Sequence, residues 1–210
     1  MANRTDSRIS EHATKAAEAF VSAYYAASDS PQRTQLVPTL YLPNSSIVWN
    51  GTPVSGQAEL LAMLNSMPGS KHEVQTFDCH ALSGSIQGST ATPPSLLLTV
   101  SGLVSHHTPE SRSAQPPSNA PKSSSAAGGS SASAKKGGFD PDAPISSHPR
   151  CFSQSFLLVP SQAVLAAQGA AAGQTIDGGV SASSTSGKDG TGVTIADKYF
   201  VQADTFRFVG

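Results

Sequence analysis

Residues 47–57 read Ile-Val-Trp-Asn-Gly-Thr-Pro-Val-Ser-Gly-Gln, and this stretch decides the fold. Asn50-Gly51 is a strong signal for a two-residue β-hairpin, because a type I′ turn needs positive φ at both central positions. Pro53 cannot donate a hydrogen bond to a neighbouring strand, so the returning strand is expected at a sheet edge. A helix start follows, where Glu59 places a carboxylate near the positive end of the helix. The stretch therefore predicts a hairpin that leads directly into a helix.

The spacing of apolar residues predicts the other elements. Helices are expected at 7–27, 32–42 and 57–67, and Pro38 leaves the bounds of the second helix open. Strands are expected at 46–49, 52–55, 73–81, 96–104, 152–159 and 198–208. Helices segregated from consecutive strands predict an α+β domain, with three helices packed on one face of a curved antiparallel sheet.

Composition divides the 210 residues unevenly. Residues 106–149 are mostly Ser, Pro, Ala, Gly and Lys, and residues 162–190 are mostly Ala, Gly, Ser and Thr. Such segments hold too few large apolar side chains to offset the entropy of ordering, so both are expected to be disordered loop insertions. The remainder of 7–210 is the size of one domain, roughly 140 residues.

Charge and hydropathy exclude several classes of protein. A net charge of −1 argues against a dedicated nucleic-acid binder, which would present a basic face. Residues 1–10 contain no apolar core of a signal peptide, and no run is long and apolar enough for a membrane span. The sequence therefore predicts a soluble, intracellular protein without a membrane partner, in which Cys79 and Cys151 are reduced.

Strand alternation predicts two different sheet faces. In the last strand, one face receives Phe200, Gln202, Asp204, Phe206 and Phe208, and the other receives Tyr199, Val201, Ala203, Thr205 and Arg207. In the strand before it, Ser153, Ser155, Leu157 and Val159 are expected on the second face. That face is too apolar for free solvent and too poor in large residues for a core. The mixture predicts a surface that another protein covers.

No metal, cofactor or catalytic site is predicted. Cys79 and His80 are adjacent in a strand and point to opposite faces, so they cannot easily bind one zinc ion with His148 and Cys151. No His–carboxylate pair is found at inward positions, and Asp204 is expected to accept hydrogen bonds from backbone donors instead. Trp49 is expected to pack rather than to bind a ligand.

Several motifs, taken in this order of elements, resemble the nuclear transport factor two fold. The motifs are Trp49-Asn50-Gly51, Val54-Ser55-Gly56-Gln57, Asp78-Cys79, Val100-Ser101-Gly102, Phe152-Ser153-Gln154-Ser155-Phe156 and Asp204-Thr205-Phe206-Arg207-Phe208. The first three more narrowly resemble the export branch of this family, the small subunits of the heterodimeric mRNA export receptor. The resemblance runs from residue 16 to 208 and skips both insertions.

The resemblance implies a cone-shaped domain that pairs, sheet to sheet, with a similar domain of the large export receptor subunit. Such heterodimers are non-enzymatic and shuttle between nucleus and cytoplasm, carrying mRNA–protein particles through the nuclear pore by touching Phe-Gly repeats of nucleoporins. The family pattern implies that Arg207 meets an aspartate of the large subunit, and that Ser155 and Thr205 lie on the same interface. The full predicted partner-binding set is Arg207, Thr205, Ala203, Val201, Ser155, Ser153 and Leu157.

Two alternatives stay open at this point. One is a homodimeric carrier of the same fold that imports the GDP form of the small GTPase Ran, for which Asp140 and Asp142 faintly resemble an acidic patch. The other is an enzyme, because related cone-shaped folds hold catalytic sites between helices and sheet.

Overall fold

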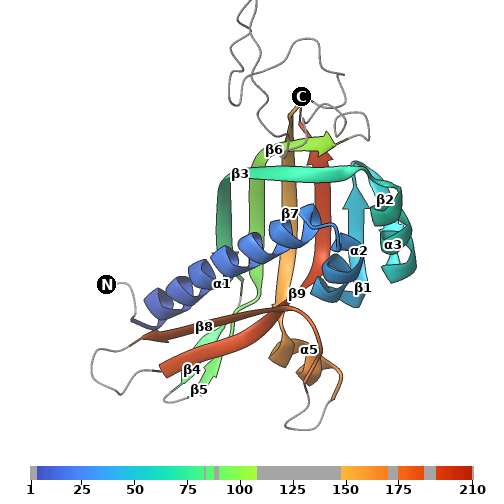
Figure 1. Cartoon of the computed structure of the whole chain (residues 1–210). Helices are drawn as coiled ribbons and strands as arrows, with labels where there is room; N and C mark the ends of the chain where they lie inside the picture. The colour runs from blue at the N-terminus through green and yellow to red at the C-terminus, as the bar shows by residue number, and fades with distance from the viewer. Residues whose placement is uncertain are drawn as a thin grey trace, which may run out of the picture.

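The computed structural model describes residues 4–82, 84–87, 90–107, 148–169, 175–186 and 193–209 (Figure 1). The helices are α1 (Arg4–Asp29), α2 (Arg33–Leu36), the 3₁₀ helix η1 (Val37–Leu40), α3 (Gly56–Ser66) and α5 (Ser161–Ala167). The strands are β1 (Tyr41–Trp49), β2 (Thr52–Ser55), β3 (Gly69–Ala81), β4 (Ser85–Gln87), β5 (Thr90–Thr92), β6 (Leu96–His107), β7 (Arg150–Pro160), β8 (Val180–Ser186) and β9 (Val193–Phe208). The α+β class is confirmed.

The main sheet has the strand order β2-β1-β9-β7-β6-β3, and β8 pairs with the first half of β9. The expectation of a purely antiparallel sheet is wrong at one place, because β1 and β9 run parallel. The first and last strands of the chain meet there, and their directions are set by the hairpin on one side and by β7 on the other. Strands β4 and β5 form a separate two-stranded sheet.

The hairpin and the helix after it are confirmed. Asn50 and Gly51 have φ of 47° and 87°, as a type I′ turn requires. Strand β2 lies at the sheet edge, where Pro53 needs no partner. The α3 helix begins at Gly56, and the Glu59 carboxylate accepts a hydrogen bond from the backbone N–H of Ser55.

The core lies between α1 and the sheet. One stripe of α1 is buried against the inward side chains of the strands; its members are Ala13, Ala16, Ala17, Phe20, Val21, Tyr24, Tyr25 and Ala27. Phe20 meets Phe156 of β7 edge to face, with ring centroids 5.2 Å apart. Trp49 packs as expected, since its ring stacks on that of Phe206 at 3.9 Å.

The second helix differs from the prediction for 32–42. Only Arg33–Leu36 is α-helical, and Val37–Leu40 tightens into a 3₁₀ turn around Pro38, whose ring cannot supply the hydrogen bond of a longer α-helix. Arg33 fixes this segment to α3, because its guanidinium donates to the backbone oxygens of Leu64, Met67 and Pro68.

The predicted insertion at 162–190 is wrong in part, because it contains most of α5 and all of β8. Local composition does not predict these two elements, because each is held in place by contacts with residues that are distant in the sequence. Strand β8 alternates buried Val180, Ala182 and Ser184 with exposed residues, and it pairs with β9 along its whole length. Of the insertion predicted at 106–149, residues 108–147 lie outside the described part, and His106 and His107 belong to β6 rather than to a linker.

Candidate functional site

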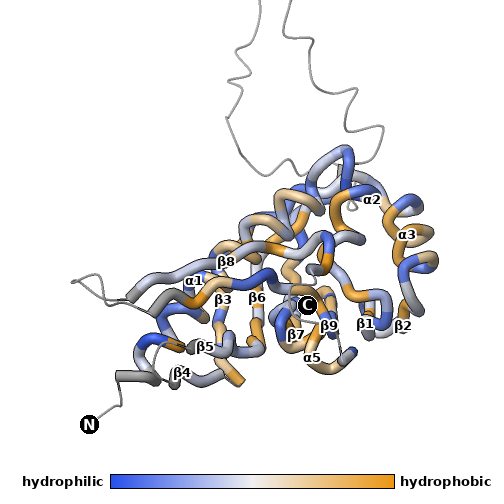
Figure 2. The backbone as a smooth tube through the Cα atoms, turned by 90° about the horizontal axis from the view of Figure 1, so that it is seen from below, coloured by the Kyte–Doolittle hydropathy of each residue, from blue (hydrophilic) through white to orange (hydrophobic). Residues whose placement is uncertain are grey.

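Helices cover the two faces of the main sheet unequally. In Figure 2, α1, α2 and α3 lie on one side of the strands, and α5 lies on the other side at one end. We call the side that packs against α1 and α3 the inner face, and the opposite side the outer face. Apart from the end beneath α5, no described helix or strand covers the outer face.

Strand register places the outward side chains in rows across the sheet. From β3 toward β2, the rows are His80, Leu97, Leu157, Ala203, Ser46 and Ser55; then Asp78, Thr99, Ser155, Thr205, Val48 and Pro53; then Thr76, Ser101, Ser153 and Arg207; and then Glu73, Leu103 and Cys151. Every one of these residues is half-buried or exposed in the isolated chain. Small, hydroxylated and aliphatic side chains predominate in this surface. Such a surface suits contact with another protein better than catalysis.

Arg207 carries the only charge in these rows outside β3. Its side chain is exposed, and it lies opposite Ser153 of β7. Two ion pairs join described side chains, Glu11–Lys15 and Asp29–His72, and Arg207 belongs to neither. Arg207 therefore has no ion-pair partner among the described residues, and its guanidinium is available for hydrogen bonds beside a half-apolar surface.

Six of the seven residues predicted to bind a partner lie on the outer face. These are Arg207, Thr205, Ala203, Ser155, Ser153 and Leu157, brought together by the pairing of β7 with β9. The placement of Val201 is wrong, because its side chain is fully buried in the core beneath α1. The reason is a β-bulge in β9 between Val201 and Ala203, which shifts the alternation by one residue. Tyr199 faces inward for the same reason.

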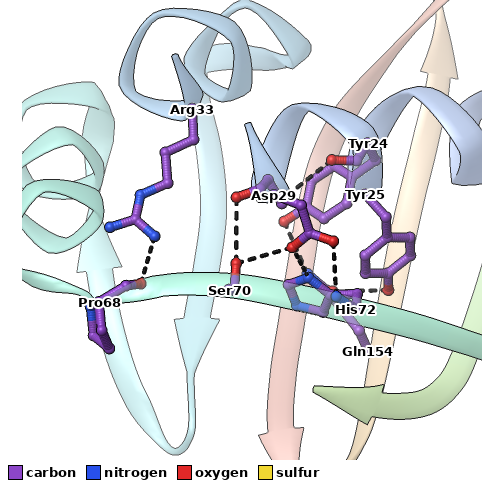
Figure 3. Close-up of polar contacts among 9 residues, drawn as sticks. Tyr24, Tyr25, Asp29, Arg33, Pro68, Ser70, His72 and Gln154 are labelled. Atoms are coloured by element: carbon purple, nitrogen blue, oxygen red, sulfur yellow. Dashed lines mark hydrogen bonds and ion pairs between the residues drawn. The ribbon is translucent and has the colours of Figure 1, made fainter. Parts of the chain in front are cut away.

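The inner face carries a closed polar network around Asp204, which is 2% exposed. Tyr41 donates to the Asp204 carboxylate at 2.6 Å, and the Gln154 side-chain nitrogen donates to it at 2.9 Å and to the Tyr24 oxygen at 3.0 Å. Tyr25 donates to the Gln154 oxygen at 3.0 Å, as Figure 3 shows. Tyr41 donates its only hydroxyl proton to Asp204. In the 2.9 Å hydrogen bond between the two tyrosines, Tyr24 is therefore the donor and Tyr41 the acceptor.

The groups that donate to the Asp204 carboxylate are thus side chains, not the backbone N–H groups expected from the sequence. Burial raises the pKa of Asp204 to about 6, although the hydrogen bonds from Tyr41, Gln154 and Tyr24 work in the opposite direction. No described cation forms an ion pair with it. The network joins α1, β1, β7 and β9 through one buried carboxyl group.

A His–carboxylate pair that was not predicted from the sequence lies beside this network. His72 Nδ1 is 2.6 Å from the Asp29 carboxylate, which also accepts from the His72 backbone N–H and from Ser70 (Figure 3). Burial alone would raise the pKa of Asp29, but the hydrogen bonds from His72 and Ser70 outweigh it and lower that pKa. Asp29 is the last residue of α1 and His72 lies in the first half of β3, so only the folded chain brings them together.

These groups do not enclose room for a substrate. The space lined by Tyr24, Tyr41, His72, Gln154 and Asp204 is about 30 Å³, which suits a water molecule rather than an organic ligand. Within the described ranges, no cluster of three or more His, Cys, Asp or Glu could hold a metal ion. No helix in the part that the structure describes is long and apolar enough to cross a bilayer.

Comparison with known proteins shows which family this chain is similar to. The family model described as "Nuclear transport factor 2 (NTF2) domain" matches residues 16–115. NTF2-related export protein 1 of Bos taurus is 34% identical over 92 residues, which are 44% of this chain and 62% of that protein. The NTF2-related export protein 1 of Schizosaccharomyces pombe is 30% identical over 94 residues, which are 45% of this chain and 73% of that protein. The chain thus spans about 62% of the length of the bovine relative that it matches.

Among solved structures, the similarity extends over nearly the whole chain. The "Chaetomium thermophilum Mex67 NTF2-like domain complexed with Mtr2" gives a TM-score of 0.50 at 19% identity, covering 94% of this chain and 99% of that chain. Identity at this level shows the fold alone.

Proposed function

The chain belongs to the nuclear transport factor 2 family, and on this premise we propose that it is the small subunit of a heterodimeric mRNA export receptor. In this role the outer face packs against the NTF2-like domain of the large subunit. The names of its relatives, all NTF2-related export proteins, support the export branch over the import of Ran-GDP. We treat the domain as spanning 7–210, and the heterodimer as the unit that contacts Phe-Gly repeats and mRNA–protein particles while shuttling through the nuclear pore.

The observation that carries this proposal is the exposed Arg207 on the outer face. A guanidinium covered by a partner needs a planar acceptor such as a carboxylate, which it binds through two parallel hydrogen bonds. The neighbouring Ser153, Ser155 and Thr205 are short, so they let a second sheet approach closely. Pairing would therefore cover a surface that is unpartnered in the isolated chain and would place an acidic residue of the large subunit against Arg207.

The space between helices and sheet supports a non-enzymatic role. Asp204 and its donors satisfy one another, so no described polar group of the network is directed at a bound substrate. The enclosed volume of about 30 Å³ is far below the few hundred Å³ of usual ligand sites, roughly 300–1,000 Å³.

The test is co-expression with the large-subunit NTF2-like domain encoded in the same genome, followed by affinity capture and size-exclusion chromatography. Arg207→Asp should abolish capture while leaving the thermal unfolding of the isolated chain nearly unchanged. Leaving a covered charge unpaired costs on the order of 3–5 kcal/mol, or more than a hundredfold in affinity. Unchanged capture by this variant would contradict the proposal.

Arg150→Asp is the matched control. Arg150 is also an exposed arginine near the same end of the sheet, but its guanidinium lies over the Phe208 ring at 3.7 Å, and it pairs with the buried Val104 rather than with the outer rows. This variant makes the same change in charge and should retain capture. A stable homodimer of the wild-type chain that binds Ran-GDP would favour the import carrier instead.

A further inference from the structure

The segment around α5 is the one described helix on the outer side of the sheet (Figure 2). It covers a second hydrophobic cluster formed by Leu42, Val159 and Phe200, against which Val164 of α5 and Ile176 pack. These three strand residues continue the outer face beyond the row of Ser46, Ala203 and Leu157. The α5 helix is thus built onto the same face that the proposed partner uses.

Specific contacts hold this segment in place. The Asp197 carboxylate of β9 accepts hydrogen bonds from the Ser161 hydroxyl and from the backbone N–H of Gln162, which fixes the first turn of α5. The Lys198 ammonium group donates to the backbone oxygen of Ile176 at 3.3 Å. Farther along, the backbone N–H of Gly179 donates to the oxygen of Thr39 at 2.9 Å. The position of α5 is therefore determined by the strands beneath it.

We propose that α5 forms one wall of the partner-binding face, and that an uncharged segment of the large subunit lies in the groove between α5 and the sheet. This inference rests on the proposed function. Two stacked sheets lie about 10 Å apart, and a helix with its side chains is about 10–12 Å across. A partner sheet on the outer face and α5 thus occupy the same layer, so the partner must either contact α5 or stop short of the row of Ser46, Ala203 and Leu157.

The chemistry of the groove supports contact. Ala163 and Ala167 line its helix side with methyl groups, so a neighbouring backbone can approach closely. Asn44, Gln202 and Gln168 contribute three carboxamides, and within the described residues these make no hydrogen bond. The bulge in β9 directs Gln202 to this side, next to Ala203 of the outer face, so groove and face are continuous.

Carboxamides both donate and accept, which suits the alternating N–H and C=O groups of an extended backbone. None of the described residues that line the groove is charged, so an acidic or basic helix would gain no ion pair from them. The expected occupant is therefore an extended segment of the large subunit with small or apolar side chains.

The experiment compares Ala167→Glu with Ala166→Glu in the full chain, titrated calorimetrically with the large-subunit NTF2-like domain. Ala167 lines the groove, and its neighbour Ala166 is an exposed residue of the same helix that does not. A charge buried without a partner at an interface should raise the Kd at least about tenfold for Ala167→Glu, whereas Ala166→Glu should stay within about twofold. Hydrogen exchange on the wild-type pair supplies a second readout, in which the amides of 162–168 should exchange more slowly in the complex.

The outcomes separate the two proposals. Wild-type binding with equal affinities for both variants and unchanged exchange at α5 overturns the inference and leaves the proposed function standing. No binding by the wild-type chain overturns the proposed function, and the inference falls with it. If Ala167→Glu fails to fold, the hydrogen exchange of the wild-type complex decides alone.

Discussion

Replacing Asp204 with asparagine should remove a large part of the pH dependence of stability. Asp204 is 2% exposed, and burial raises its pKa from 3.8 to about 6. The folded chain therefore holds a proton at this carboxyl group more tightly than the unfolded chain does. The resulting stabilisation is fully present below about pH 4 and is lost as the pH rises through about 6.

The magnitude follows from the shift. Two pKa units, at about 1.4 kcal/mol each, make the free energy of unfolding fall by about 3 kcal/mol between about pH 4 and pH 7. Asp29 acts with the opposite sign, because its lowered pKa stabilises the fold as the pH rises. The contribution of Asp204 is therefore isolated only as the difference between the wild-type chain and the variant.

Urea unfolding at half-unit pH steps measures that difference. At low pH, Asp204→Asn should be less stable than the wild type, because its amide group faces the Gln154 nitrogen as a second donor. The difference should shrink or reverse by about 3 kcal/mol toward pH 7. Asp78→Asn, which removes an exposed carboxylate of β3, is the control and should retain the wild-type profile. A difference between wild type and Asp204→Asn that stays constant within about 0.5 kcal/mol would refute the reasoning.

Two further predictions concern the sheet. A Cβ on Gly102 would lie 2.2 Å from the backbone oxygen of Glu73, so Gly102→Ala should destabilise the fold by about 1–3 kcal/mol, and a melting temperature equal to that of the wild type would contradict this. Leu98 is fully buried and its neighbour Leu97 is 41% exposed on the outer face. In chemical denaturation of the isolated chain, Leu98→Ala should lower the free energy of unfolding by about 2–5 kcal/mol, and Leu97→Ala should lower it by no more than about 0.5 kcal/mol. Similar losses of stability for the two variants would show that the two faces are wrongly assigned.

Local sequence predicted the elements whose causes are local. The hairpin followed from Asn50-Gly51, whose backbone angles are set by two residues, and α3 followed from the periodic Leu60 and Leu64. The α5 helix did not follow, because its seven residues are held by Asp197 and Phe200 of β9, at least 30 positions away in the chain. The parallel pairing of β1 with β9 has the same kind of cause, since nothing within either strand specifies its neighbour.

The site was predictable to the extent that strand alternation holds. Counting by two placed Arg207, Thr205 and Ala203 on the outer face, but the bulge at Gln202 put Val201 in the core. A bulge is one extra residue in a ladder, and it leaves no mark in a pattern of apolar residues that continues on both sides. The partners of Asp204 were hidden for a related reason, because they come from helix and strand residues that meet only in the fold.

The buried network and the outer face depend on the same two strands. Gln154 lies between Ser153 and Ser155 on β7, and Asp204 lies between Ala203 and Thr205 on β9, so inward polar groups alternate with outward residues of the proposed interface. A slip of one residue between β7 and the core would turn Gln154 outward and leave the Tyr25 hydroxyl buried without its hydrogen-bond partner. The same slip would bury the outward residues of the proposed interface. The network thus destabilises any register of β7 and β9 in which the outward residues would turn into the core. This gives a physical reason for keeping Asp204, although burying its carboxyl group costs free energy.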